Sequence, residues 1–515
     1  MRRMPDEPYQ LDAVDDLHAS VRGGTRAVLI AQIVSQAVSI LVLAVMCRLV
    51  APTAYGLLGQ ILPVVMLPRM AATLGLATAV LQHRELSRAQ LTQLFWLNLL
   101  GGVVATIATL ALGPVLATAY GRPELAPLCY AMAGTNLIAA ALNQHSALLE
   151  RSLRLGRLSI ARIVAQATGG IAGIGLALSG AGVWALVAQQ YAEWLALAIG
   201  VWLAMPWRPG WPRRGVALGT IVSFSSFYSL STLVHYVAQN LEKIVFPLLL
   251  GPQADRAIGL YSQAFNLMIK PVYLITAPLS GVMVSAIARA RGDRQLTNEL
   301  TTRFFRLAAL ALLPCSAGLL VVAPDLMLVL AGPEWKEAGP LLAALAPAIF
   351  AQGLMNLAGL LLAAVGRAEQ LLFASLVFCL LLVQGFVVGY FAGGYVWPSE
   401  PNGSQAPLGA LLGVALAYTV VTTGVWLLPF LGFCFRTAGV PLRGVLLAIA
   451  PSVRPAALMG LCVWVLRQGL LQVESVNAPV RLVLLAAAGG LLYFALARRE
   501  LQWCFREWVQ LRASP

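Results

Sequence analysis

The chain has 515 residues, of which 59% are hydrophobic and only 11% are charged, and its mean hydropathy is +0.79. This composition excludes an ordinary soluble protein and predicts an all-α polytopic membrane protein. The formal net charge of +14 fits basic loops that meet anionic lipid head groups, so we expect membrane lipids as partners and no nucleic acid.

Apolar stretches long enough to cross a bilayer recur from Arg26 to Glu500. A hydrocarbon core of about 30 Å needs about 20 apolar residues per helix, and no alternating strand pattern occurs, so we predict about fourteen transmembrane helices. The first seven are expected at approximately Arg26 to Val50, Tyr55 to Leu81, Leu91 to Tyr120, Ala126 to Leu149, Ser159 to Gly180, Gly182 to Trp207 and Val216 to Leu250. The second seven are expected at approximately Ala257 to Ala288, Phe304 to Ala331, Ala338 to Val365, Gln370 to Phe391, Pro407 to Phe435, Val445 to Leu466 and Pro479 to Ala497.

The basic residues predict how the chain is oriented. Most of the 35 Lys and Arg residues lie in the even-numbered loops and in the two terminal segments. Because cytoplasmic loops carry the excess of Lys and Arg, both termini are expected in the cytoplasm. Residues 1–25 are polar and lack the features of a signal peptide, which predicts a cytoplasmic arm. Residues 498–515 mix aromatic and charged side chains and are expected to form a cytoplasmic amphipathic tail.

An internal repeat organises the helices into two lobes. The segment Val50 to Leu57 reads like Gly251 to Tyr261, and Gly121 to Glu124 reads like Gly332 to Glu334. A repeat of six helices returns the chain to its starting side, so the two lobes should have the same orientation. We therefore predict an N-terminal lobe at 26–207, a C-terminal lobe at 208–435 and two additional helices at 436–497.

Two cations lie inside predicted membrane helices, each beside a proline, as Pro68-Arg69 and Lys270-Pro271. An ionisable group deep in a bilayer costs about 2.5 to 3.5 kcal/mol on insertion scales, so it usually faces a polar interior. Both fall in the second helix of their repeat. This duplication predicts a central cavity that binds an anion. A snorkelling or structurally paired charge is the alternative explanation.

Further polar residues are weaker candidates for the cavity wall. In the seventh segment Tyr228, His235 and Gln239 share a helical face, as do Gln263, Asn266 and Lys270 in the eighth. Hydrogen bonding between helices explains such stripes equally well. The remaining candidates are Arg48 and Lys243 as weak substrate contacts, and Glu193 and Glu242 as groups for ion coupling.

Neither a metal site nor a cofactor site is expected. The seven cysteines lack metal-ligand spacing, and the chain has no phosphate-binding Gly-x-x-x-x-Gly-Lys-Ser/Thr run. Transport would therefore draw its energy from a gradient or from downstream consumption.

Four stretches resemble one membrane protein family: Leu91 to Leu99, Gly182 to Gln189, Asn240 to Lys243 and Gly259 to Ser262. They are similar to the Wzx-type polysaccharide flippases of the multidrug, oligosaccharidyl-lipid and polysaccharide exporter superfamily. The resemblance implies a V-shaped pair of six-helix lobes that work by alternating access. It also implies the substrate, a polyprenyl-diphosphate-linked oligosaccharide that is moved to the outer leaflet of the bacterial plasma membrane for O-antigen, exopolysaccharide or capsule synthesis.

The resemblance also implies roles and partners. The related lipid II flippases carry cavity arginines in helices one, two and eight. Arg69 and Lys270 match the second and the eighth by position, whereas Arg48 lies in the first helix but near its outer end. The lysine keeps the charge but loses the bidentate grip of arginine on a phosphate. A polysaccharide polymerase and chain-length machinery are implied partners.

Two rival functions belong to other classes. A drug exporter of the same superfamily is possible because fold does not determine substrate, although it would more naturally place a carboxylate at the cavity centre. A membrane-bound glycan polymerase would be an enzyme with a sizeable external loop. The longest predicted outer loop, Gly393 to Ala406, has only Glu400 as an acid, so we expect a transporter rather than an enzyme.

Overall fold

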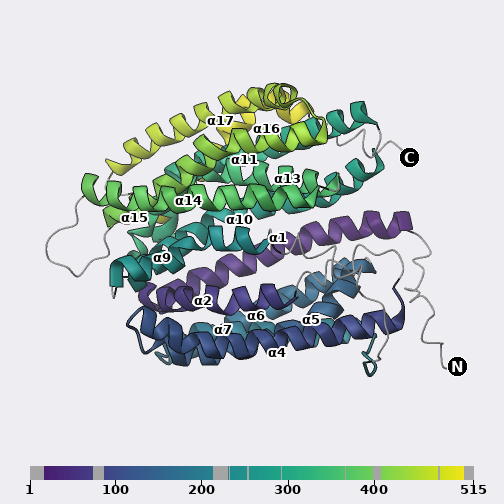
Figure 1. Cartoon of the computed structure of the whole chain (residues 1–515). Coiled ribbons are helices and arrows are strands. Elements are labelled where there is room, and N and C mark those ends of the chain that lie inside the picture. The colour runs from purple at the N-terminus through teal and green to yellow at the C-terminus, as the bar shows by residue number, and fades with distance from the viewer. Residues whose placement is uncertain are drawn as a thin grey trace. The chain divides into compact units, whose positions relative to one another are not determined.

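The structure is a computed structural model that describes residues 17–73, 86–152, 154–212, 230, 232–251, 254–290, 293–365, 367–397, 408–473 and 476–503. The elements in these ranges are helices (Figure 1), which confirms the predicted all-α class. The chain divides into two compact units, Met1–Gly259 (unit 1) and Leu260–Pro515 (unit 2). The boundary between the units falls inside a single helix, α10 (Ala254–Arg289).

Unit 1 is a bundle of long apolar helices, coloured purple to blue in Figure 1. They are α1 (Leu17–Leu49), α2 (Pro52–Thr73), α4 (Arg88–Ala119), α5 (Leu125–Arg151), α6 (Leu155–Leu178) and α7 (Val183–Ala204), followed by the short α9 (Leu241–Leu250). The start of α4 is set by a capping box, in which the Gln90 N–H donates to Ser87 Oγ and the Ser87 N–H donates to Gln90 Oε1. Large apolar side chains such as Ile107, Ile171 and Leu203 are exposed, as helices that face lipid require.

Unit 2 contains most of α10 and the remaining helices. They are α11 (Arg294–Leu330), α12 (Ala338–Leu345), α13 (Ala348–Ala364), α14 (Ala368–Val396), α15 (Leu408–Thr419), the π-helical turn η3 (Val420–Trp426), α16 (Leu427–Ala438), α17 (Leu442–Leu471) and α18 (Ala478–Leu496). The predicted segment from Ala338 to Val365 bends by 48° between α12 and α13. Pro347 lies at this break and cannot donate a backbone hydrogen bond, which explains the bend.

Most of the predicted membrane segments overlap these helices. Residues 74–81 of the second predicted segment and 216–229 of the seventh lie outside the described residues. In the described part of the chain, eleven helices are long and apolar enough to cross a membrane, or twelve if the bent pair α12 and α13 forms one span. The polytopic class is therefore confirmed, and the count of about fourteen stays a prediction. The helix α7 is not among these eleven. Its polar side chains, including Gln189, Gln190 and Glu193, lower its hydropathy.

The pattern of helix neighbours repeats along the chain. In unit 1, α5 packs against α4, α6 and α7; in unit 2, the pair α12 and α13 packs against α11, α14, α15 and α16. Glycines bring two of the helix pairs very close. A Cβ added to Gly173 of α6 would lie 2.9 Å from the Gln189 Cβ of α7, and one added to Gly389 of α14 would lie 2.5 Å from the Gly413 oxygen of α15. Small residues at such contacts are what allows close packing of membrane helices.

The two copies of the repeated glycine motif contact each other within unit 1. A Cβ on Gly56 in α2 would overlap the backbone carbonyl of Asp255, and a Cβ on Gly259 in α10 would overlap that of Pro52. Gly56 in the first motif copy is therefore equivalent to Gly259 in the second, and Pro52 is equivalent to Asp255. These reciprocal contacts hold α2 close to the first turns of α10.

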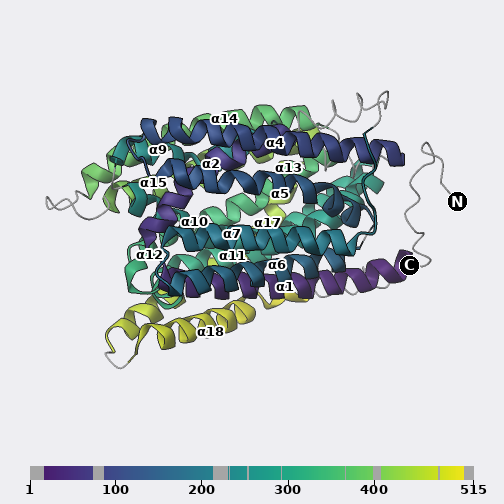
Figure 2. The same ribbon diagram turned by 90° about the horizontal axis from the view of Figure 1, so that it is seen from below.

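The two additional helices are tied to α11 by a buried ion cluster (α18 is the yellow helix in Figure 2). The Asp325 side chain is only 2% exposed, and its carboxylate accepts hydrogen bonds from Arg467 Nε of α17 (2.8 Å) and Arg481 Nε of α18 (2.8 Å). A second ion pair joins Arg306 of α11 to Glu500 at 2.7 Å. The hairpin of α17 and α18 is therefore an integral part of unit 2.

Replacing Asp325 by Asn should destabilise unit 2 strongly. The substitution leaves two partly buried arginines without their shared counter-charge, and breaking a buried ion pair typically costs about 3 to 5 kcal/mol. We expect a clear fall in the midpoint of thermal unfolding of the purified protein. The control is Glu150→Gln, which breaks the exposed pair with Arg162 (3.0 Å) and should cost less than about 1 kcal/mol. Equal midpoints for the two variants would contradict this account.

Candidate functional site

Arg69 lies in α2 immediately after Pro68, and the helix continues through both positions. Pro68 has no N–H, so the carbonyl of Val64 one turn earlier receives no helical hydrogen bond. The Thr109 hydroxyl of α4 lies 3.5 Å from this carbonyl oxygen. The proline therefore creates a polar spot in the helix wall, and a polar side chain of the neighbouring helix lies beside it.

The Arg69 guanidinium is held by neutral groups from two other helices of unit 1. The residue is 8% exposed. Its Nε donates to Asn136 Oδ1 (2.8 Å) and its Nη2 donates to Thr135 Oγ1 (2.7 Å), both in α5. The ring of Trp194 in α7 lies 5.0 Å from the guanidinium carbon, within the range of a cation–π contact. These three partners are uncharged, and together they hold the guanidinium in one orientation.

Lys270 has a similar local sequence in α10 of unit 2. Pro271 follows it within the helix, so the carbonyl of Leu267 loses its helical donor. Lys270 is half-buried, Gln263 is 5% exposed, and Asn266 is exposed. These three residues recur on one face of α10, as predicted. The predicted roles in substrate binding stay predictions.

The other predicted residues have varied surroundings. Arg48 is exposed in the last turn of α1, and Glu193 of α7 is half-buried without an ion pair among the described residues. His235 and Gln239 are half-buried on the helical residues 232–239, and Lys243 donates to Asn240 Oδ1 (2.6 Å). Two candidates, Tyr228 and the side chain of Glu242, lie outside the described residues.

Unit 1 also contains a buried charge cluster that the sequence analysis did not predict. Asp255, 7% exposed, accepts two hydrogen bonds from Arg122 (3.1 and 2.6 Å) and one from Gln60 (2.6 Å). The hydrogen bond with Asp255 is the largest effect that raises the pKa of Arg122 above its ordinary value. Gln60 and Asp255 lie close in sequence to the repeated glycine motifs, and this position was the sequence feature that could have indicated the cluster. The cluster fixes the first turn of α10 onto unit 1.

Two further buried polar residues were also missed. Asn98 of α4 and Gln144 of α5 are both fully buried, and neither side-chain amide has a hydrogen-bond partner in the described part of the chain. They lie one turn beyond the close contact of Gly102 with Ala140. Buried amides normally find partners, often ordered water. Together with the hydrogen bond from Asn136 Nδ2 to Thr109 Oγ1 (3.0 Å), they make part of the interface between α4 and α5 polar.

Several known proteins of polysaccharide biosynthesis are similar to this chain. The chain is similar to the lipopolysaccharide biosynthesis protein WzxC of Escherichia coli, with 23% identity over 79% of this chain and 81% of the relative. It is also similar to the teichuronic acid biosynthesis protein TuaB of Bacillus subtilis, with 26% identity over 82% and 84%. A third relative is the succinoglycan biosynthesis transport protein ExoT of Rhizobium meliloti, with 23% identity over 88% and 87%.

Solved structures show the same fold. The lipid II flippase MurJ in an inward closed conformation matches 94% of this chain and 100% of its own with a TM-score of 0.70 at 11% identity. An inward-facing MATE transporter of the MOP superfamily matches 80% and 99% with a TM-score of 0.54 at 14% identity. A family model described as "polysaccharide biosynthesis protein" matches residues 45–340. Because this match covers more than half of the chain, the protein is a member of the polysaccharide biosynthesis protein family, with the fold of the MOP transporter superfamily.

Proposed function

We propose that the protein is a flippase that moves a polyprenyl-diphosphate-linked oligosaccharide from the inner to the outer leaflet of the bacterial plasma membrane by alternating access. The product would serve the synthesis of a surface polysaccharide such as O-antigen, exopolysaccharide or capsule. The names of the relatives support this, since they include a transport protein of succinoglycan biosynthesis. Family membership and a multi-helix membrane fold favour a transporter over an enzyme. Both termini would face the cytoplasm.

The observation that carries the proposal is the oriented cation Arg69. A diphosphate with its sugars cannot enter hydrocarbon cheaply, whereas the polyprenyl tail stays there. A guanidinium whose fork is already fixed by Asn136 and Thr135 offers a strong partner for phosphate oxygens. In this proposal Arg69 binds the diphosphate, Lys270 adds a second point charge, and uncharged polar side chains such as Gln263 and Asn266 accommodate sugar hydroxyls. A polymerase and chain-length machinery would receive the product.

A double substitution tests the two cations together. We expect Arg69→Ala with Lys270→Ala to abolish surface polysaccharide in a deletion strain while folded protein persists in the membrane. Arg162→Ala serves as the control, because it removes an exposed cation from another membrane helix of unit 1. Wild-type levels of polysaccharide from the double variant would sink the assignment.

The lysine should act mainly as a point charge. We therefore expect Lys270→Arg to retain more export than Lys270→Ala, because it keeps the charge and adds donors. Surface polysaccharide in the complemented deletion strain is the readout. Equal loss in both variants would indicate a role for Lys270 other than charge.

A drug exporter is the second candidate, and Glu193 is the observation that favours it. This half-buried carboxylate of α7 has no ion pair within the described residues, and it could bind a cationic drug or a coupling proton. Deletion of the gene separates the two functions. A flippase predicts loss of surface polysaccharide with unchanged drug sensitivity, whereas an exporter predicts the reverse.

A further inference from the structure

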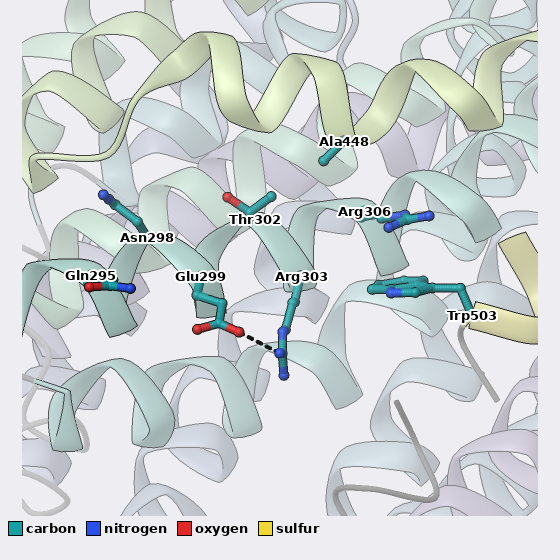
Figure 3. Close-up of a pocket in the computed structure, with 8 residues that line it drawn as sticks. All are labelled: Gln295, Asn298, Glu299, Thr302, Arg303, Arg306, Ala448 and Trp503. Atoms are coloured by element: carbon teal, nitrogen blue, oxygen red, sulfur yellow. Dashed lines mark hydrogen bonds and ion pairs between the residues drawn. The ribbon is translucent and has the colours of Figure 1, made fainter. Parts of the chain in front are cut away.

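Unit 2 contains a polar pocket that belongs to neither cation site. Its volume is about 520 Å³, and it lies between the first part of α11, α17 and the helical residues 498–503 (Figure 3). Six of its wall residues come from one face of α11, namely Gln295, Asn298, Glu299, Thr302, Arg303 and Arg306. They recur at helical steps of three and four, so a continuous polar stripe of one helix forms one side of the pocket.

The length of α11 places the pocket at the level of lipid head groups. The helix has 37 residues and is therefore about 55 Å long, well beyond the hydrocarbon thickness of about 30 Å. The apolar part begins at Phe304, so the polar stripe before it projects beyond the hydrocarbon. In the orientation predicted from the basic loops, this end of α11 faces the cytoplasm.

The far wall is apolar or aromatic and leaves the polar stripe open to a ligand. Ala448 of α17 lies opposite the stripe, and Trp503 closes one end (Figure 3). Arg306 fixes that end, because its guanidinium pairs with Glu500 (2.7 Å) and lies 3.8 Å from the centre of the Trp503 ring. Aromatic side chains of this kind are common at membrane interfaces. The ion pair and the ring contact of Arg306 therefore define this end of the pocket.

The stripe offers both donors and acceptors. Arg303 contacts Glu299 at 2.5 Å and is 39% exposed at its side chain, so part of it faces the solvent side of the pocket. Asn298 also lines this wall, but its Oδ1 atom is buried and cannot be reached by a ligand in the pocket. Arginine suits a phosphodiester, and the carboxylate and amide oxygens suit hydroxyl groups.

Basic residues surround this end of unit 2. Arg294 donates to the Gly439 carbonyl (3.2 Å), which brings the starts of α11 and α17 together. Arg436 and Arg498 lie on the adjoining ends of α16 and the helical residues 498–503. Such basic surroundings attract anionic lipids of the cytoplasmic leaflet. The basic residues concentrate anionic lipids near the pocket, and the polar stripe supplies the contacts that distinguish their head groups.

From these observations we propose that the pocket binds the head group of an anionic phospholipid whose phosphodiester carries free hydroxyls, of the phosphatidylglycerol type. The phosphate contacts Arg303, and the glycerol hydroxyls donate to Glu299. The acyl chains extend along the apolar surface of α11 and α17. This site is independent of the proposed transport of a lipid-linked glycan.

Native mass spectrometry of the delipidated full-length protein tests the assignment. The protein is titrated with phosphatidylglycerol and with phosphatidylcholine, and the occupancy of the first bound lipid is measured. We expect phosphatidylglycerol to bind preferentially. Arg303→Gln should weaken this binding by about tenfold, because a charge-assisted hydrogen bond is lost. A rise in thermal unfolding midpoint on lipid addition should shrink in parallel.

Arg443→Gln is the matched control, because Arg443 is an exposed arginine at the same end of unit 2 that does not line the pocket. It should change the affinity less than twofold if the pocket, and not the general charge of this face, selects the lipid. Equal weakening by Arg443→Gln and Arg303→Gln would overturn the proposal. So would equal binding of phosphatidylcholine. Binding of free glycerol phosphate as tight as that of the lipid would assign the pocket to a soluble phosphate ester instead.

Discussion

Arg69→Ala is expected to reduce export of the lipid-linked glycan by at least about tenfold, because a charge-assisted contact to phosphate disappears. The substitution also leaves Asn136 and Thr135 without their donor, which should cost about 1 to 3 kcal/mol of stability. Surface polysaccharide in a complemented deletion strain measures export, and size-exclusion chromatography of the purified protein measures folding. Arg69→Lys should restore little, because lysine cannot reproduce the two directed hydrogen bonds.

Asn136→Ala separates a binding role of Arg69 from a purely structural one. It removes the 2.8 Å hydrogen bond that joins α2 to α5 but keeps the cation. If Arg69 binds the substrate, this variant should retain most of its export. If Arg69 only joins two helices, Asn136→Ala and Arg69→Ala should fail to a similar degree, and the substrate-binding role would have to be abandoned.

The second large effect is expected from Gly56→Ala. The backbone carbonyl of Asp255 occupies the place of the new methyl group, and neither backbone can yield without separating α2 from α10. Overpacking in a rigid core costs about 1 to 3 kcal/mol, and more where backbone must move. We expect about 3 kcal/mol or more here. The yield of monodisperse protein after membrane extraction should therefore fall sharply.

Gly175→Ala provides the comparison for this prediction. Gly175 is also a helical glycine of unit 1, but nothing lies within 4 Å of an added Cβ. Alanine is the better helix former by about 0.8 to 1 kcal/mol, so this variant should be as stable as the wild type or more so. A normal yield from Gly56→Ala would show that the reciprocal glycine contact does not govern the packing of α2 against α10.

The helices could be predicted because hydrophobic length is a local property of the sequence. The segment predicted from Phe304 to Ala331 lies within α11, and the segment from Val445 to Leu466 lies within α17. The structure begins α11 earlier, at Arg294, and extends α17 at both ends, to Leu442 and Leu471. Hydropathy does not record such extensions. The bend at Pro347 and the π-helical turn η3 depend on packing against neighbours and were not predicted.

The partners of the charged residues could not be predicted in the same way. Arg69 was chosen from its depth and its proline, but its contacts with Thr135 and Asn136 depend on how α2 packs against α5. Asp325 was likewise visible only as a charge near a helix end. Its burial beneath Arg467 and Arg481 follows from the docking of α17 and α18 on α11. Pairings between residues far apart in the chain require the tertiary structure.

The extra hairpin of α17 and α18 has a structural explanation. Ion pairs from Asp325 at one end and Arg306 at the other tie this hairpin and the residues that follow it to α11. These ties at two heights hold the hairpin to a single orientation on α11. The same arrangement creates the pocket closed by Trp503. The hydropathy pattern shows α17 and α18 only as two more membrane spans, but α17 and the residues after α18 also line this pocket.

The most direct test of the proposed function is a flipping assay with purified protein in liposomes that contain a polyprenyl-diphosphate-linked oligosaccharide. An impermeant reagent that modifies the glycan on the outer surface reports movement between leaflets. We expect the wild-type protein to expose the inner pool rapidly, and the variant with both Arg69→Ala and Lys270→Ala to leave that pool protected. Equal exposure with wild-type protein, with the double variant and in protein-free liposomes would contradict the account.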